Sequence, residues 1–146
     1  MFVYSRDYGL NIFQRKGFFE INHLKKIAIS KGVNYLFNGH DDYLLIGSKE
    51  GLYNYGNETL TEVLPKIDVL HIFRDSKNRY WVSTIGDGLI VLDDKFKVIS
   101  RFFKNEKVNV CYNVVQFKEK EFYVATSLGL YALRNQMILL KLKKSK

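Results

Sequence analysis

Residues 80–89 read Tyr-Trp-Val-Ser-Thr-Ile-Gly-Asp-Gly-Leu, a short hydrophobic run that ends in hydroxyl residues and is followed by a turn and the pair Gly-Leu. The same arrangement recurs at residues 2–10, 45–52 and 123–130, and its glycines stand 42, 37 and 41 residues apart. A repeat of about this length is typical of stacked or radial repeat architectures, so the repeat decides the fold class.

Each copy predicts several short strands. The hydrophobic run is one strand, Gly-Leu opens the next, and a turn-forming pair separates that strand from a third. The strands after the turn are expected at residues 18–21, 59–64, 97–103 and 137–142, and a further strand precedes the last three copies at 33–37, 69–73 and 108–117. In the last of these, alternation predicts that Val108, Val110, Tyr112 and Val114 share one face and that Asn109, Cys111 and Asn113 share the other.

Four short strands per copy, without helical periodicity, predict an all-β fold: a partial β-propeller of about four four-stranded antiparallel blades, the first of them incomplete. We expect one propeller segment over residues 1–146, with blades at approximately 1–26, 32–65, 67–104 and 108–143. One such sheet cannot bury both of its faces, so each blade is expected to supply core to its neighbour. Because the chain starts inside a blade, we expect a fragment or truncated product.

Composition agrees with a packed β domain and gives little support for a polyanionic partner. The 146 residues are 47% hydrophobic and include ten Tyr and eleven Phe, residue types that favour strands. The net charge of +8 comes partly from a terminal tail, Lys141, Lys143, Lys144 and Lys146, and otherwise from scattered positions. We therefore interpret it as solubilising charge and expect no nucleic-acid partner. No apolar stretch is long enough for a membrane span and Met1 to Leu10 does not read as a secretory signal, so we expect a soluble segment without membrane contact.

Residues that could carry chemistry have structural interpretations. His23, His40 and His71 lack metal-ligand spacing, and no nucleophile elbow or phosphate loop occurs. The pairs Asp41-Asp42 and Asp93-Asp94 are expected in turns. Trp81 and the lone Cys111 are expected in the core. We therefore predict no catalysis, no metal and no cofactor.

Residues 72–89 read Ile-Phe-Arg-Asp-Ser-Lys-Asn-Arg-Tyr-Trp-Val-Ser-Thr-Ile-Gly-Asp-Gly-Leu, and this run resembles the two-component regulator propeller repeat. The resemblance rests on the turn at Asp75, then Trp81, an aliphatic and a small residue, Thr84 and the pair Gly88-Leu89. It is weaker in the other copies, and together the copies cover nearly the whole chain.

The resemblance is in particular to the sensor region of bacterial hybrid two-component histidine kinases. It implies a periplasmic propeller that recognises glycans or their breakdown products in signal transduction. The kinase would lie elsewhere in the parent protein. The similar proteins close seven blades, about twice what this chain supplies.

The turns between the second and third strands of each blade open on the face that propellers most often use for binding. Those turns hold the candidate ligand-binding residues, which are Arg6, Asp7, Tyr8, Lys49, Glu50, Asp87 and Ser127. A mixture of positively and negatively charged side chains with one aromatic ring suits a hydroxyl-rich ligand, such as an oligosaccharide, better than a uniform polyanion.

The leading prediction is a non-catalytic ligand-sensing propeller segment. The alternatives are a propeller that acts as a protein-interaction scaffold and a fragment of a propeller-type lyase or glycosidase. Open blade ends predict self-association, for instance as a dimer that completes an eight-bladed ring, or poor solubility.

Overall fold

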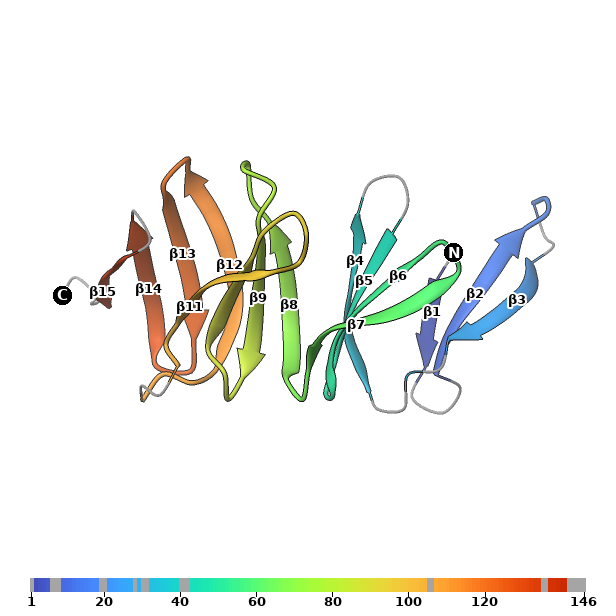
Figure 1. Ribbon diagram of the computed structural model, residues 1–146, viewed down its shortest axis with the longest axis horizontal. Helices are drawn as coiled ribbons and strands as arrows, with labels where there is room; N and C mark the ends of the chain where they lie inside the picture. The colour runs from blue at the N-terminus through green and yellow to red at the C-terminus, as the bar shows by residue number, and fades with distance from the viewer. Residues whose placement is uncertain are drawn as a thin grey trace.

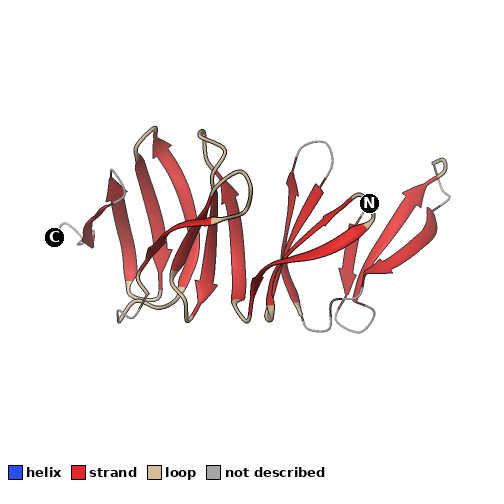
Figure 2. Ribbon diagram, in the orientation of Figure 1, coloured by secondary structure: helices blue, strands red, loops and turns tan. Residues whose placement is uncertain are grey.

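The computed structural model describes residues 2–5, 9–18, 21–27, 29, 32–39, 43–104, 107–134 and 137–141, and for 2–5 and 137–141 it describes the backbone alone. Within these residues the fold is entirely strands, turns and loops, with no helix (Figure 2). The prediction of an all-β chain is confirmed.

The described residues form fifteen strands in four antiparallel sheets. The first sheet consists of β1 (Phe2–Ser5), β2 (Gly9–Arg15) and β3 (Ile21–Ile27). The second consists of β4 (Val33–Gly39), β5 (Tyr43–Ser48), β6 (Gly51–Gly56) and β7 (Thr59–Pro65). The third consists of β8 (Asp68–Arg74), β9 (Tyr80–Ile85), β10 (Leu89–Leu92) and β11 (Val98–Phe102). The fourth consists of β12 (Cys111–Lys118), β13 (Glu121–Thr126), β14 (Gly129–Arg134) and β15 (Met137–Lys141).

The four sheets follow one another in chain order, from β1–β3 at one end to β12–β15 at the other (Figure 1). Each sheet is an up-and-down meander of neighbouring strands, and three buried clusters join each sheet to the next. This is the partial β-propeller that the repeat predicts, with three strands described in the first sheet.

The inner strands of the third sheet are buried at consecutive positions, without the alternation of a half-exposed strand. Tyr80 and Val82 of β9 pack into the cluster shared with the second sheet, whereas Trp81 packs into the cluster shared with the fourth. Because both faces of this sheet are covered, β9 and β10 are buried almost throughout, as expected of strands inside a stack.

Stacked aromatic rings lie at the contact between the third and fourth sheets. The ring centroids of Trp81 and Phe122 lie 4.2 Å apart, and Phe102 stacks on Trp81 at 6.0 Å. Trp81 is therefore a core residue, as the sequence indicated, and so is Cys111, which lies fully buried in the same cluster.

Two sequence-based details are wrong. The pairing of β12 with β13 shifts between Cys111 and Asn113, and this bulge reverses the alternation, so Cys111 and Val114 are buried while Tyr112 is exposed. The strand expected at residues 18–21 corresponds to β3, which spans Ile21–Ile27; Phe18 lies outside any strand, and residues 19 and 20 lie outside the described part of the chain.

Candidate functional site

The repeated hydroxyl residue has a structural role in the turn between the second and third strands. Thr84 Oγ1 donates to the carbonyl of Gly88 at 2.7 Å and accepts from the Asp87 amide at 3.2 Å. Ser48 and Thr126 make the corresponding bonds to the carbonyls of Gly51 and Gly129 at 3.1 and 2.7 Å. We call Ser48–Gly51, Thr84–Gly88 and Thr126–Gly129 the hydroxyl turns; the hydroxyl closes each one by local bonding to the backbone.

The glycine that ends each turn is required by the neighbouring strand. A Cβ at Gly51 would overlap the carbonyl oxygen of Leu64, and a Cβ at Gly88 would overlap that of Phe102. Both carbonyls belong to the last strand of the same sheet. Gly88 also has a positive φ of 70°, which disfavours any side chain there.

The hydroxyl turns lie in a row because the connections between sheets bind to them. The Lys66 amide, in the connection from the second to the third sheet, donates to the carbonyl of Glu50 at 2.7 Å. The carbonyl of Asn109, in the next connection, accepts from Gly86 at 2.9 Å and from Gly88 at 3.3 Å. The adjacent Val110 carbonyl accepts from Ser127 at 3.1 Å. Lys49, Glu50, Asp87 and Ser127 therefore lie along one edge of the stack.

The aspartate of the resemblance motif is also structural. Asp75 is buried, and its Oδ1 accepts from the amides of Lys77 and Arg79 at 2.8 and 3.0 Å. Its Oδ2 accepts from Arg79 Nε at 2.7 Å and from Trp81 Nε1 at 2.8 Å. Burial alone would raise the pKa of Asp75, but the bonds from Trp81 and Arg79 outweigh it and the pKa is lowered.

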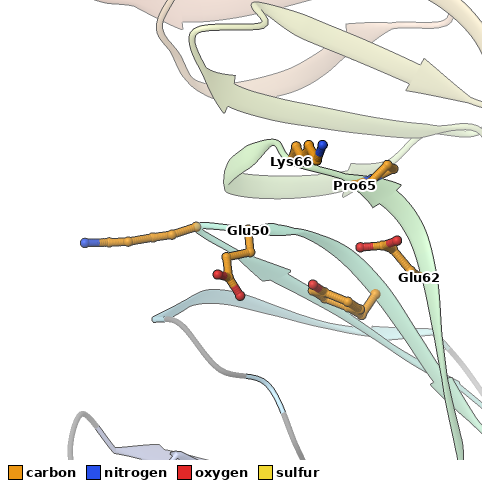
Figure 3. Close-up of a pocket in the computed structure, with 6 residues that line it drawn as sticks. Glu50, Glu62, Pro65 and Lys66 are labelled. Carbon is orange, nitrogen blue, oxygen red and sulfur yellow. The ribbon is translucent and has the colours of Figure 1, made fainter.

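A surface cleft of about 480 Å³ adjoins the first hydroxyl turn of the row. It is lined by Lys49, Glu50, Tyr53, Glu62, Pro65 and Lys66, and we call it the Tyr53 cleft. Figure 3 shows Pro65 and Lys66 along one side and the side chains of Glu50 and Glu62 across from them. These residues come from the turn, from β6, from the middle and the end of β7 and from the connection to the third sheet.

The Tyr53 cleft combines one aromatic ring with carboxylates and ammonium groups. Tyr53 is half-buried, and its ring also packs against the cluster between the first and second sheets, which fixes its position. Burial raises the pKa of the Tyr53 hydroxyl, and the negative charges of Glu62 and Glu50 raise it further. The phenol is therefore a neutral hydrogen-bond donor at neutral pH, beside acceptors and cations.

The structure assembles only part of the predicted site. Lys49 and Glu50 line the Tyr53 cleft, whereas Asp87 and Ser127 belong to the next two hydroxyl turns. Arg6, Asp7 and Tyr8 lie outside the described residues, and so do His40, Asp41 and Asp42. Sequence reasoning missed Tyr53, Glu62, Pro65 and Lys66. In the repeat, Tyr53 and Glu62 occupy ordinary strand positions, Pro65 ends a strand and Lys66 lies in a connection, so nothing in the sequence marks them as site residues.

The other described candidates for chemistry, Asp93 and His71, lie in a turn and in a strand. Asp93 accepts from the amides of Lys95 and Lys97 at 2.9 and 2.8 Å, the turn role expected for it. His71 lies in β8, half-exposed, with its ring edge-on to Tyr35 at 4.6 Å, and burial lowers its pKa.

The described residues hold neither a cluster of metal-ligating side chains nor a membrane-spanning helix. No group of three or more His, Cys, Asp or Glu side chains there could hold a metal ion. None of these residues forms a helix long and apolar enough to cross a membrane.

Two solved structures share the fold of this chain. The chain is similar to PorZ, described as an essential bacterial surface component of the type-IX secretion system of Porphyromonas gingivalis, with a TM-score of 0.67 and 21% identity over 86% of the chain. It is also similar to the extracellular domain of the putative hybrid two-component system BT3049 of B. thetaiotaomicron, with a TM-score of 0.65 and 19% identity over 82% of the chain.

These likenesses are likenesses of fold. The chain spans 22% of the length of the PorZ structure and 17% of the BT3049 structure. No protein-family model and no curated protein sequence matches the chain. The resemblance to a hybrid two-component sensor therefore holds for the fold of its extracellular domain.

Proposed function

We propose that the chain is a non-catalytic ligand-binding module of a sensor-type β-propeller that works outside the cytoplasm in signal transduction. The fold shared with the extracellular domain of BT3049 supports the sensor role and the compartment. The resemblance of residues 72–89 to the two-component regulator propeller repeat supports the same reading.

The observation that carries the proposal is the Tyr53 cleft. An aromatic residue whose ring is fixed by packing, two acidic residues and two lysines line one open volume of about 480 Å³, within the usual size range of ligand sites. A sugar presents an apolar face to such a ring and hydroxyl groups to acceptors and donors around it. The cleft balances Glu50 and Glu62 against Lys49 and Lys66, which favours a neutral hydroxyl-rich ligand over a polyanion. We assign it to an oligosaccharide of the glycan type.

In a longer sensor, such binding would act through the connections between sheets. Lys66 lines the Tyr53 cleft and its amide also bonds to Glu50, so a ligand there contacts both the hydroxyl turn and the path into the third sheet. A ligand that binds one arrangement of the sheets better than another shifts the population toward it.

The test is titration of the ¹⁵N-labelled chain with a panel of neutral oligosaccharides of four to six sugars, and with heparin hexasaccharide as the polyanion. We expect the amide signals of Glu50, Tyr53 and Glu62 to shift with a neutral member. Glu62→Gln should weaken that binding by about tenfold, because a hydrogen bond to a charged acceptor is replaced by a neutral one. Glu119→Gln, at an exposed position in the turn between β12 and β13, is the matched control and should leave binding unchanged.

Three results would overturn the proposal. They are the absence of shifts with every neutral member at millimolar concentration, tighter binding of heparin hexasaccharide at the cleft, and cleavage of any bound sugar during the titration. The last result would favour the glycosidase alternative.

A further inference from the structure

In the part of the chain that the structure describes, the face of the fourth sheet that points away from the third is largely apolar and no other sheet covers it. Phe122 and Val124 point inward to the core, so the register of β12, β13 and β14 places Val115, Tyr123, Leu130 and Ala132 on the outward face. Phe117 joins them, since its ring meets that of Tyr123 edge-on at 5.6 Å. Of these, Phe117 is 63% exposed, Val115 51% and Leu130 42%, whereas Tyr123 is half-buried and Ala132 is buried. We call these five residues the outward face.

The same positions of the repeat form the core between the other sheets. Trp81, Leu89 and Val91 of the third sheet correspond to Tyr123, Leu130 and Ala132, and they pack on the fourth sheet. The outward face therefore has the composition of an interface between sheets. Among the described residues no other sheet packs on it, and an exposed apolar face of this kind marks an interaction surface.

The opposite end of the stack is different. Leu10 of β2 is buried against the second sheet, so pairing places Asn11, Arg15, His23 and Lys26 on the outer face of the first sheet, together with Phe13 and Ile21. Asn11 Oδ1 and His23 Nε2 lie 2.9 Å apart in a hydrogen bond, and the His23 ring sits edge-on to Phe13 at 5.3 Å. A polar outer face of this kind caps a row of repeats.

Charge also distinguishes the two ends. At the margin of the outward face, Arg134 Nη2 lies 3.3 Å from Glu121 Oε2, and Tyr123 donates to Glu121 Oε1 at 2.9 Å. Lys118 Nζ lies 5.3 Å from the centroid of the Phe117 ring, so among the described residues one further cation stands at this margin and none in the middle of the face. The outer face of the first sheet carries Arg15 and Lys26, which would lose hydration if an apolar surface covered them.

We propose that a second copy of this chain packs its own outward face on the first, so that two fourth sheets lie face to face about a two-fold axis. The residues of the outward face occupy the repeat positions that pack between sheets elsewhere in the chain. The partner that fits this face is therefore another sheet with an apolar face. Of the two end sheets that a second copy offers, only the fourth presents such a face in the part of the chain described. Two-fold dimers are also the commonest symmetric assembly.

The size of the face sets the strength of this dimer. Four strands about 4.8 Å apart and about six residues long at about 3.3 Å per residue give a face of roughly 400 Å². Two copies would bury about 800 Å² in total, below the roughly 1,200 Å² of most stable complexes. We therefore expect a weak dimer, with a dissociation constant between about 10 µM and 1 mM.

Analytical ultracentrifugation of the full chain over about 0.01 to 1 mM tests the association. Leu130→Lys should raise the dissociation constant at least about tenfold, because each two-fold interface receives two buried like charges. Val98→Lys in β11, at a residue that is also 42% exposed, is the matched control and should leave the dimer intact. A chain that stays monomeric at 1 mM, or a dimer unaffected by Leu130→Lys, overturns the proposal.

Cross-linking tests the symmetry and does not depend on Leu130→Lys remaining folded. With a short bismaleimide, Leu130→Cys should yield covalent dimers by itself, since β14 lies inside the sheet and meets its own copy. The unaltered chain is the control, because Cys111 is fully buried and burial raises the pKa of its thiol to about 12. Cross-links that form only when Leu130→Cys is mixed with Lys26→Cys would show head-to-tail packing and overturn the two-fold arrangement.

Discussion

Asp75 is the position at which one substitution tests how the repeat is stabilised. Asp75→Asn keeps the shape of the side chain and one carbonyl oxygen, which can still accept from the amides of Lys77 and Arg79. It replaces the oxygen that accepts from Arg79 Nε and Trp81 Nε1 with an amide group that only donates. The Trp81 N–H, buried at the contact between the third and fourth sheets, then loses its acceptor.

The magnitude follows from the bonds that are lost. A hydrogen bond to a charged group contributes about 1.5 to 3 kcal/mol, and a buried donor without an acceptor costs about 1 to 3 kcal/mol. Because Asn cannot serve either donor, we expect the free energy of unfolding to fall by about 3 to 5 kcal/mol at pH 7, a large part of the stability of a typical domain.

The assay is urea unfolding followed by the fluorescence of Trp81, the single Trp of the chain. Since the native fold lowers the pKa of Asp75 below its unfolded value of about 3.9, this contribution is fully present above that pH. It is lost as the pH falls through the native pKa. The difference between the unaltered chain and Asp75→Asn should therefore be largest near neutrality and shrink below about pH 4.

Asp93→Asn is the matched control. Asp93 accepts from the amides two and four residues ahead, as Asp75 does, but its turn is exposed and it makes no bond to Trp or Arg in the described structure. We expect a loss below about 1 kcal/mol. Equal losses for the two variants, or a difference at Asp75 that does not depend on pH, would refute the reasoning.

Three further measurements test the turns and the core. Gly88→Ala should destabilise the chain by more than about 3 kcal/mol, because the new Cβ would overlap backbone atoms. Gly86→Ala should cost about 1 kcal/mol, because Gly86 has a positive φ but no atom within 4 Å of the new Cβ. Urea unfolding of both variants checks this. Thr84→Val should lower the free energy of unfolding by about 1 to 3 kcal/mol, because the hydrogen bond to the Gly88 carbonyl is lost. Thr59→Val, at an exposed position, should change it very little. Equal midpoints of the two variants in thermal unfolding would contradict this. Cys111 should react with a thiol reagent slowly in the native chain and at least about a hundredfold faster in 6 M urea, since exposure of the buried thiol requires unfolding; comparable rates would place it outside the core.

The amino-acid sequence alone determined the architecture. Repeating hydrophobic runs, each followed by a hydroxyl residue and Gly-Leu, are local features, and local hydrogen bonds explain them: Ser48, Thr84 and Thr126 each close their own turn. The burial of Trp81 also follows from its place in a strand of the repeat. These features are readable in sequence because the groups involved lie close together along the chain or recur with its period.

Only the tertiary structure decided the candidate sites. Glu62 joins Lys49 and Glu50 at the Tyr53 cleft because β7 returns alongside β6, a pairing that brings distant residues together. The bulge at Cys111 reversed the faces of β12, and one residue of register is enough to do this because side chains alternate with a period of two. Which end face of the stack is polar and which is apolar likewise depends on register across several strands, and no single segment carries that information.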